Sequence, residues 1–170
     1  MKVDIEACEK KMTEVKKICK SVCKKYSVKV YFDDKFKNYG PDRNCAVTGY
    51  DYVECAKFDY WNYDLLAISV FHEIGHIEQA RRYKEWRDGN VPVEYRDRPN
   101  GWVSEYRAWD FAIKLYMDVF KKNISIKISN FILGCLKSYL PDYNPSERYP
   151  DQTEKESPFW CPIKKRVIRS

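Results

Sequence analysis

Residues 65–77 read LLAISVFHEIGHI and contain both histidines of the 170-residue chain, His72 and His76. The flanking residues are apolar on nearly every side, a pattern typical of a helix buried between layers. Positions i and i+4 of a helix lie on one face, so two imidazole nitrogens there can converge on a single ion. Glu73 stands between the histidines and can reach a water bound to that ion. The stretch predicts a metal site on a buried helix; the alternative is a pair of ordinary core or surface histidines.

Hydrophobic periodicity predicts further elements on both sides of this stretch. We expect helices over about residues 4–26, 62–86, 102–122 and 129–140, with Asn62 or Asp64 capping the second. Alternating, β-rich residues predict strands at 27–32, 45–48 and 52–58, the last two joined by a tight turn. The polar segment 81–101 predicts a long loop after the histidine helix, and residues 124–128 are ambiguous. The expected fold class is α+β: a small three-stranded, mainly antiparallel sheet packed on a helical layer that contains the buried HExxH helix. We expect one domain over residues 1–140 and an extended C-terminal tail over 141–170.

A catalytic zinc site needs a third protein ligand, and no further histidine is present to supply it. Glu105, Ala108 and Ala112 share one face of the helix predicted after the long loop. The small alanines, together with Gly75 on the histidine helix, would let the two helices approach closely enough for Glu105 to reach the metal. Alternatively, Glu105 caps its own helix. Weaker candidates for the third ligand are Asp110, Asp97 and Glu94.

These two motifs together resemble a known family. Phe71–His76, FHEIGH, followed by Glu105–Ala112, EYRAWDFA, is similar to the ImmA/IrrE-type metallopeptidases of phages, mobile elements and bacterial stress responses. In that family an H-E-x-x-H helix precedes a helix with E-x-x-A-x-x-F-A, whose Glu is the third zinc ligand. The resemblance covers residues 1–140. It implies a zincin-like, gluzincin-type domain that binds Zn²⁺ through His72, His76 and Glu105.

The residues and the resemblance predict the same chemistry, that of a zinc-dependent metallopeptidase. Zinc would lower the pKa of its water towards about 7. Glu73 would take that water's proton as it attacks a peptide carbonyl, and would pass it to the leaving amine. We expect a protein or peptide substrate, such as a regulatory protein, and the strand at 52–58 could bind it if that strand forms the sheet edge. Candidates for a second donor to the oxyanion are Tyr83, Tyr95, Tyr106 and Arg107.

A different class of function is a zinc-stabilised regulatory binding module with little or no turnover. The presence of Glu73 argues against it, because a purely structural site has no need of that acid. A structural site would also close with a fourth protein ligand, whereas an enzyme keeps that position open. A cysteine enzyme is disfavoured because neither histidine is free to pair with a thiol.

Composition and charge limit the classes of partner and the cellular compartment that we expect. The net charge is +6, but the lysines of the first helix are interleaved with glutamates and no nucleic-acid-binding motif accompanies them, so we expect no nucleic-acid partner. Neither a secretory signal nor a membrane span is recognisable, so we expect a cytoplasmic protein whose seven cysteines are mostly free thiols. Cys19 and Cys23 have the spacing of a metal-ligand pair but lack nearby partners.

Overall fold

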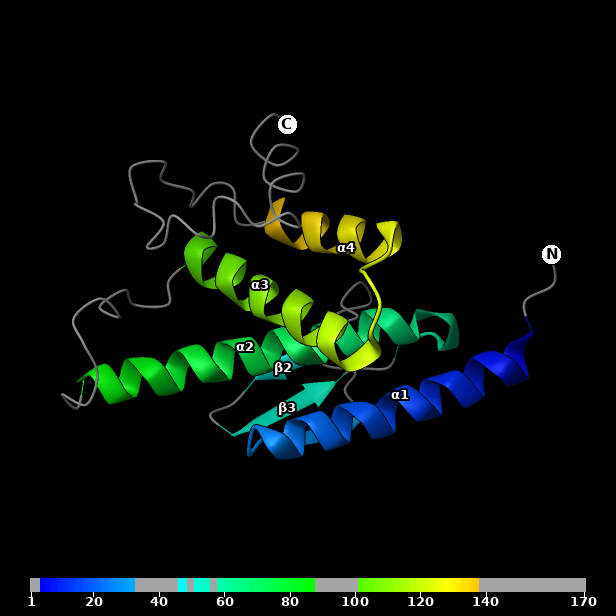
Figure 1. The fold of residues 1–170 in the computed structure, drawn as a ribbon, viewed down its shortest axis with the longest axis horizontal. Helices are drawn as coiled ribbons and strands as arrows, with labels where there is room; N and C mark the ends of the chain where they lie inside the picture. The colour runs from blue at the N-terminus through cyan, green and yellow to red at the C-terminus, as the bar shows by residue number, and fades with distance from the viewer. Residues whose placement is uncertain (1–3, 33–45, 49–50, 56–57, 88–100, 138–170) are drawn as a thin grey trace.

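The computed structural model describes residues 4–32, 46–48, 51–55, 58–87 and 101–137. Their elements follow in the order α1, β1, β2, β3, η1, α2, α3, α4, which confirms the α+β class. Helices α1 and α2 pack against each other and against the sheet, α3 crosses α2, and α4 contacts both α2 and α3 (Figure 1). The tail predicted for residues 141–170 lies outside the described residues.

Helix α1 (Ile5–Lys25) is bounded by local interactions at both ends. The Asp4 carboxylate accepts a hydrogen bond from the backbone N–H of Ala7 at 3.1 Å, which caps the first turn. After the last turn Ser27 adopts a left-handed φ of 54°, and the N–H of Val28 donates to the carbonyl of Cys23 at 2.9 Å. The apolar face of α1 is buried as its periodicity predicts, through Met12, Val15, Cys19, Val22 and Cys23.

The three strands form one mixed sheet, in the order β1-β3-β2. β2 (Ala46–Thr48) runs antiparallel to β3 (Tyr52–Cys55), but β1 (Lys29–Phe32) runs parallel to β3, with Lys29 opposite Tyr52. The prediction of a mainly antiparallel sheet is therefore wrong. Only three residues separate β2 from β3, and so short a connection requires the two strands to run antiparallel. The direction of β1 depends instead on the packing of α1, which precedes it. β3 is also the central strand, so it cannot be the edge to which a peptide adds.

Helix α2 (Tyr63–Arg87) follows the short 3-10 helix η1 (Tyr60–Asn62). It extends to Arg87, so the first residues of the predicted loop are helical, and residues 88–100 lie outside the described part. The two residues expected to cap α2 make tertiary contacts. Asp64 accepts hydrogen bonds from Tyr116 at 2.7 Å and Lys122 at 3.1 Å, and the Asn62 side chain accepts from Lys127 at 2.6 Å. As predicted, the first half of α2 is buried on nearly every side. Its buried apolar residues are Leu65, Leu66, Ala67, Ile68, Val70, Phe71, Ile74 and Ile77.

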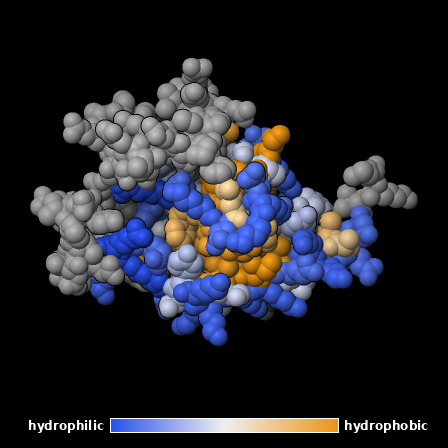
Figure 2. Space-filling view, in the orientation of Figure 1, coloured by the Kyte–Doolittle hydropathy of each residue, from blue (hydrophilic) through white to orange (hydrophobic). Residues whose placement is uncertain are grey.

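Helices α3 (Gly101–Phe120) and α4 (Ile126–Lys137) complete the core. The Ser125 hydroxyl accepts from the N–H of Ile128 at 3.3 Å and so begins α4 three residues before the predicted start. Apolar residues lie at the centre of the face in Figure 2, with hydrophilic side chains around them. Within the described segments, no helix combines the length and apolar character that a membrane span needs.

Candidate metal centre

The site forms where α2 and α3 approach each other closely. A Cβ atom added to Gly75 would lie 3.0 Å from both the Cα and the carbonyl oxygen of Ala108, and 3.3 Å from the Phe111 ring. Ala108 and Ala112 are fully buried in this contact. The small residues thus allow the close helix approach that the sequence predicts, and Glu105 stands one turn before Ala108 on α3.

Three side chains converge at this crossing: His72, His76 and Glu105. The two imidazole Nε2 atoms lie 3.0 Å apart, and each lies 3.2 Å from one oxygen of the Glu105 carboxylate. Ligands of a tetrahedral zinc ion with bonds of about 2.0–2.1 Å are about 3.3–3.4 Å apart, so the triangle needs to open only slightly. Two imidazoles and one carboxylate are also a known ligand set of catalytic zinc. The three residues can therefore hold a metal ion, and among the described residues they are the only group of this kind.

The protein environment shifts the pKa values of the three candidate ligands differently. Burial lowers the pKa of His72 to about 4, which keeps this imidazole neutral and able to coordinate at neutral pH. Burial would also lower the pKa of His76, but its hydrogen bond to Glu105 and the charges of Glu105 and Glu73 outweigh burial and raise it. Burial opposes ionisation of Glu105, yet the two histidines outweigh that effect and lower its pKa to about 2. Glu105 is therefore a carboxylate at neutral pH, the form that coordinates a metal ion.

Glu73 is half-buried on α2, and it interacts electrostatically with His76 and Glu105. Its pKa rises to about 7, mainly because burial disfavours the charged form. A carboxyl group with this pKa can gain or lose a proton near neutrality, which is the property that proton-transfer catalysis requires. The geometry thus groups the three predicted ligands, and Glu73 lies near enough to interact electrostatically with two of them.

Three neighbours of the histidines were not predicted from the sequence. Trp109 of α3 stacks on the His72 ring, with centroids 3.8 Å apart and planes at 25°. Ser104 Oγ lies 3.4 Å from His76 Nδ1, and it donates to Gln79 Oε1 at 2.7 Å. The only sequence signal for them is position: Gln79 is one turn after His76, Ser104 directly precedes Glu105, and Trp109 is one turn after it.

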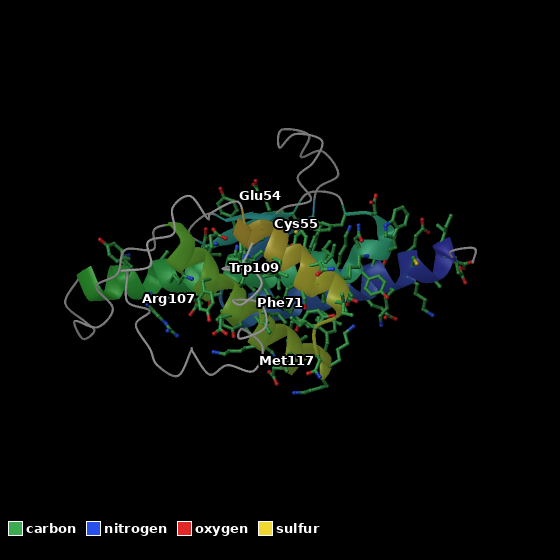
Figure 3. The ribbon with its side chains drawn as sticks, turned by 90° about the horizontal axis from the view of Figure 1, so that it is seen from above. Glu54, Cys55, Phe71, Arg107, Trp109 and Met117 are labelled. Atoms are coloured by element: carbon green, nitrogen blue, oxygen red, sulfur yellow. The ribbon has the colours of Figure 1, made fainter. Side chains whose placement is uncertain are left out.

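The remaining candidates from the sequence are distributed as follows. Asp110 is buried and forms an ion pair with Lys114, so it is not part of the metal group. Of the proposed oxyanion donors, Tyr106 is fully buried, whereas Arg107 extends outward from α3 (Figure 3). Tyr83 is half-buried on α2. Asp97, Glu94 and Tyr95 lie outside the described residues.

The cysteines in the described segments are free thiols, as predicted. Cys19 and Cys23 of α1 and Cys55 of β3 are fully buried, and Cys19 lies near the other two. Burial raises the pKa of Cys23 to about 12 and also raises that of Cys19. Such thiols are core residues, and in the described part of the chain they do not form a second metal group.

Comparisons with models of protein families, with curated proteins and with solved structures find no match to this chain. Its geometry and residue chemistry therefore carry the functional argument.

Proposed function

We propose that this chain is a zinc-dependent metallopeptidase of the ImmA/IrrE type, which hydrolyses a peptide bond in a protein substrate. One observation carries the proposal: His72, His76 and Glu105 bring two imidazole nitrogens and a carboxylate together from two buried helices. Glu73 lies on α2 with the two histidines, near enough for the charges of His76 and Glu105 to act on it. The convergence of residues from both sequence motifs supports the resemblance to this family.

Zinc suits these ligands better than a hard cation does. Calcium and magnesium prefer shells of oxygen, whereas two imidazoles with one carboxylate are typical of zinc. Within the described residues the metal group has three members, which is the number of protein ligands that a catalytic zinc site uses. That number favours catalysis over the alternative, a zinc-stabilised regulatory module, whose structural site would need a fourth protein ligand.

The bound zinc would act as a Lewis acid towards water and the substrate carbonyl. Glu73 supplies the proton transfers: it accepts a proton from the attacking water and delivers it to the amine nitrogen as the peptide C–N bond breaks. A nearby cation favours the carboxylate form of Glu73, so the residue is ready to accept a proton when the metal is present. His72 and His76 remain neutral ligands throughout, held on a rigid helix.

The substrate would bind as an extended peptide. Because β3 is central, such a peptide would have to pair with β1 or β2, and β2 lies against the histidine helix. We propose a cytoplasmic location, which the free thiols of the described cysteines support.

Zinc-loaded protein, incubated with a peptide mixture from a digested proteome, tests the peptidase activity. We expect new N-termini, detected by mass spectrometry, that disappear after removal of zinc with a chelator. The matched control is Glu73→Gln, which keeps the side chain's shape but cannot accept the proton; it should bind zinc normally and produce no new termini. Equal cleavage by Glu73→Gln and the parent would rule out the proposed role of Glu73.

A further inference from the structure

The two histidines differ in what holds the ring nitrogen that faces away from the metal position. His72 Nδ1 is buried and has no hydrogen-bond partner, and its ring is held by the stack on Trp109. His76 Nδ1 instead faces the hydroxyl of Ser104, which is 7% exposed, at 3.4 Å. Only one of the two ligands therefore has a polar partner behind it.

The Gln79 side chain fixes the direction of the hydrogen bonds at Ser104. Gln79 Nε2 lies 3.0 Å from the Ser104 carbonyl oxygen, which can only accept a hydrogen bond. The amide nitrogen must therefore point to that carbonyl, and Gln79 Oε1 must face the Ser104 hydroxyl at 2.7 Å. Because Oε1 can only accept, the single hydroxyl proton of Ser104 is donated to Gln79.

With its proton committed, the Ser104 hydroxyl can only accept from His76. Nδ1 of His76 must then keep its own proton, and Nε2 is the nitrogen that exchanges a proton for a metal ion. Nε2 is also the atom that lies 3.2 Å from Glu105. The hydrogen-bond directions and the converging ligand atoms thus agree on the same orientation of the ring.

We propose that Ser104, oriented by Gln79, is a positioning residue that holds His76 with Nδ1 protonated and Nε2 directed to the metal. This inference rests on the proposed metal centre but not on the reaction that it catalyses. Partners behind a metal-bound histidine fix its ring orientation, and their loss typically lowers metal affinity about 10–100-fold. Ser104 precedes the ligand Glu105, so one turn of α3 would both supply a ligand and orient another.

The test is the zinc affinity of the full-length chain, measured by competition with a chromophoric chelator at fixed pH. Ser104→Ala should weaken binding at least about tenfold. The matched control is Ser69→Ala, which removes another buried serine hydroxyl, three residues before His72 and without a hydrogen-bond partner. It should bind zinc like the parent. In proton NMR spectra of the zinc-loaded protein, the His76 Nδ1 proton should be visible in the parent and in Ser69→Ala, and lost to solvent exchange in Ser104→Ala.

Equal affinity of Ser104→Ala and Ser69→Ala would overturn the inference. If Ser104→Ala does not fold, Gln79→Leu decides: at this half-buried position it releases the Ser104 proton, and its affinity should fall below that of Ser69→Ala. A parent that binds no zinc overturns both this inference and the proposed function. A parent that binds zinc more tightly than Ser104→Ala but cleaves no peptide supports the inference and contradicts only the peptidase.

Discussion

Gly75 of α2 lies against the backbone of Ala108 in α3, and this contact sets the separation between His76 and Glu105. Gly75 directly precedes His76, while Ala108 is one turn after Glu105. A Cβ atom on Gly75 would be 3.0 Å from backbone atoms of Ala108, closer than real Cβ atoms normally approach, and backbone cannot rotate away as a side chain can. The convergence of the three candidate ligands therefore depends on the absence of one methyl group.

Gly75→Ala should separate the helices and weaken zinc binding. Overpacking of this kind typically costs about 1–3 kcal/mol of unfolding free energy. The matched control is Gly134→Ala on α4, where an added Cβ meets nothing within 4 Å. That variant should gain about 0.5–1 kcal/mol from helix propensity and keep its zinc affinity. Urea unfolding and chelator competition measure both effects, and a Gly75→Ala protein as stable as Gly134→Ala would contradict the contact.

Glu105→Ala should lower the zinc content of the purified protein sharply, because only two ligands remain. Asp110→Ala is the control, since this buried acid on the same helix forms an ion pair with Lys114 instead of joining the metal group. Its zinc content, measured by elemental mass spectrometry, should equal that of the parent. The reverse result, with zinc kept in Glu105→Ala and lost in Asp110→Ala, would identify Asp110 as the third ligand.

Metal-free Glu73→Gln should be more stable than the metal-free parent at alkaline pH. Burial raises the pKa of Glu73 to about 7 in the folded protein, above its unfolded value of about 4.3. Its stabilising contribution is therefore present below about pH 4.3 and is lost as the pH rises through about 7. Glutamine has no proton to lose.

The advantage of Glu73→Gln over the parent should therefore be larger at about pH 8 than at about pH 5, by on the order of 1–3 kcal/mol. Urea unfolding after chelator treatment measures it. Glu9→Gln, at an exposed position of α1, is the control for the substitution itself. A pH-independent difference between Glu73→Gln and the parent would mean that Glu73 is not held in a low-polarity environment.

Arg81→Ala should destabilise the fold without touching the metal ligands. The Arg81 guanidinium of α2 donates to the backbone carbonyls of Tyr26 and Ser27, which end α1, and also pairs with Glu78. Loss of hydrogen bonds from a charged group costs about 1.5–3 kcal/mol. The exposed Lys84 of the same helix provides a control, and Lys84→Ala should stay within about 0.5 kcal/mol of the parent. Equal thermal stability of the two variants would contradict the role of Arg81.

The sequence predicted the site better than the sheet, for a physical reason. Helical periodicity alone places His72 above His76, and small residues on two faces predict the close approach that brings in Glu105. These are short-range properties of single helices. The parallel pairing of Lys29 with Tyr52 is a long-range property, because the direction of β1 depends on the packing of α1 and not on a turn.

Polar partners across the helix crossing were equally hidden from the sequence. Ser104 and Gln79 are 25 residues apart, and neither belongs to a recognisable motif. Asp64 and Asn62 have the chemistry of helix caps, yet their side chains accept hydrogen bonds from Tyr116 and Lys127. Residue type predicts that such groups need a partner, but only the packed helices determine which partner they find.

The indole of Trp109 rests on the His72 ring with 3.8 Å between centroids. A paramagnetic ion such as Co²⁺, bound to His72 in place of zinc, would quench the excited indole at this separation. Because the chain has five tryptophans, the signal would be the share of the total emission that is lost when such an ion binds. The stack thus gives an optical readout of metal occupancy that needs no attached label.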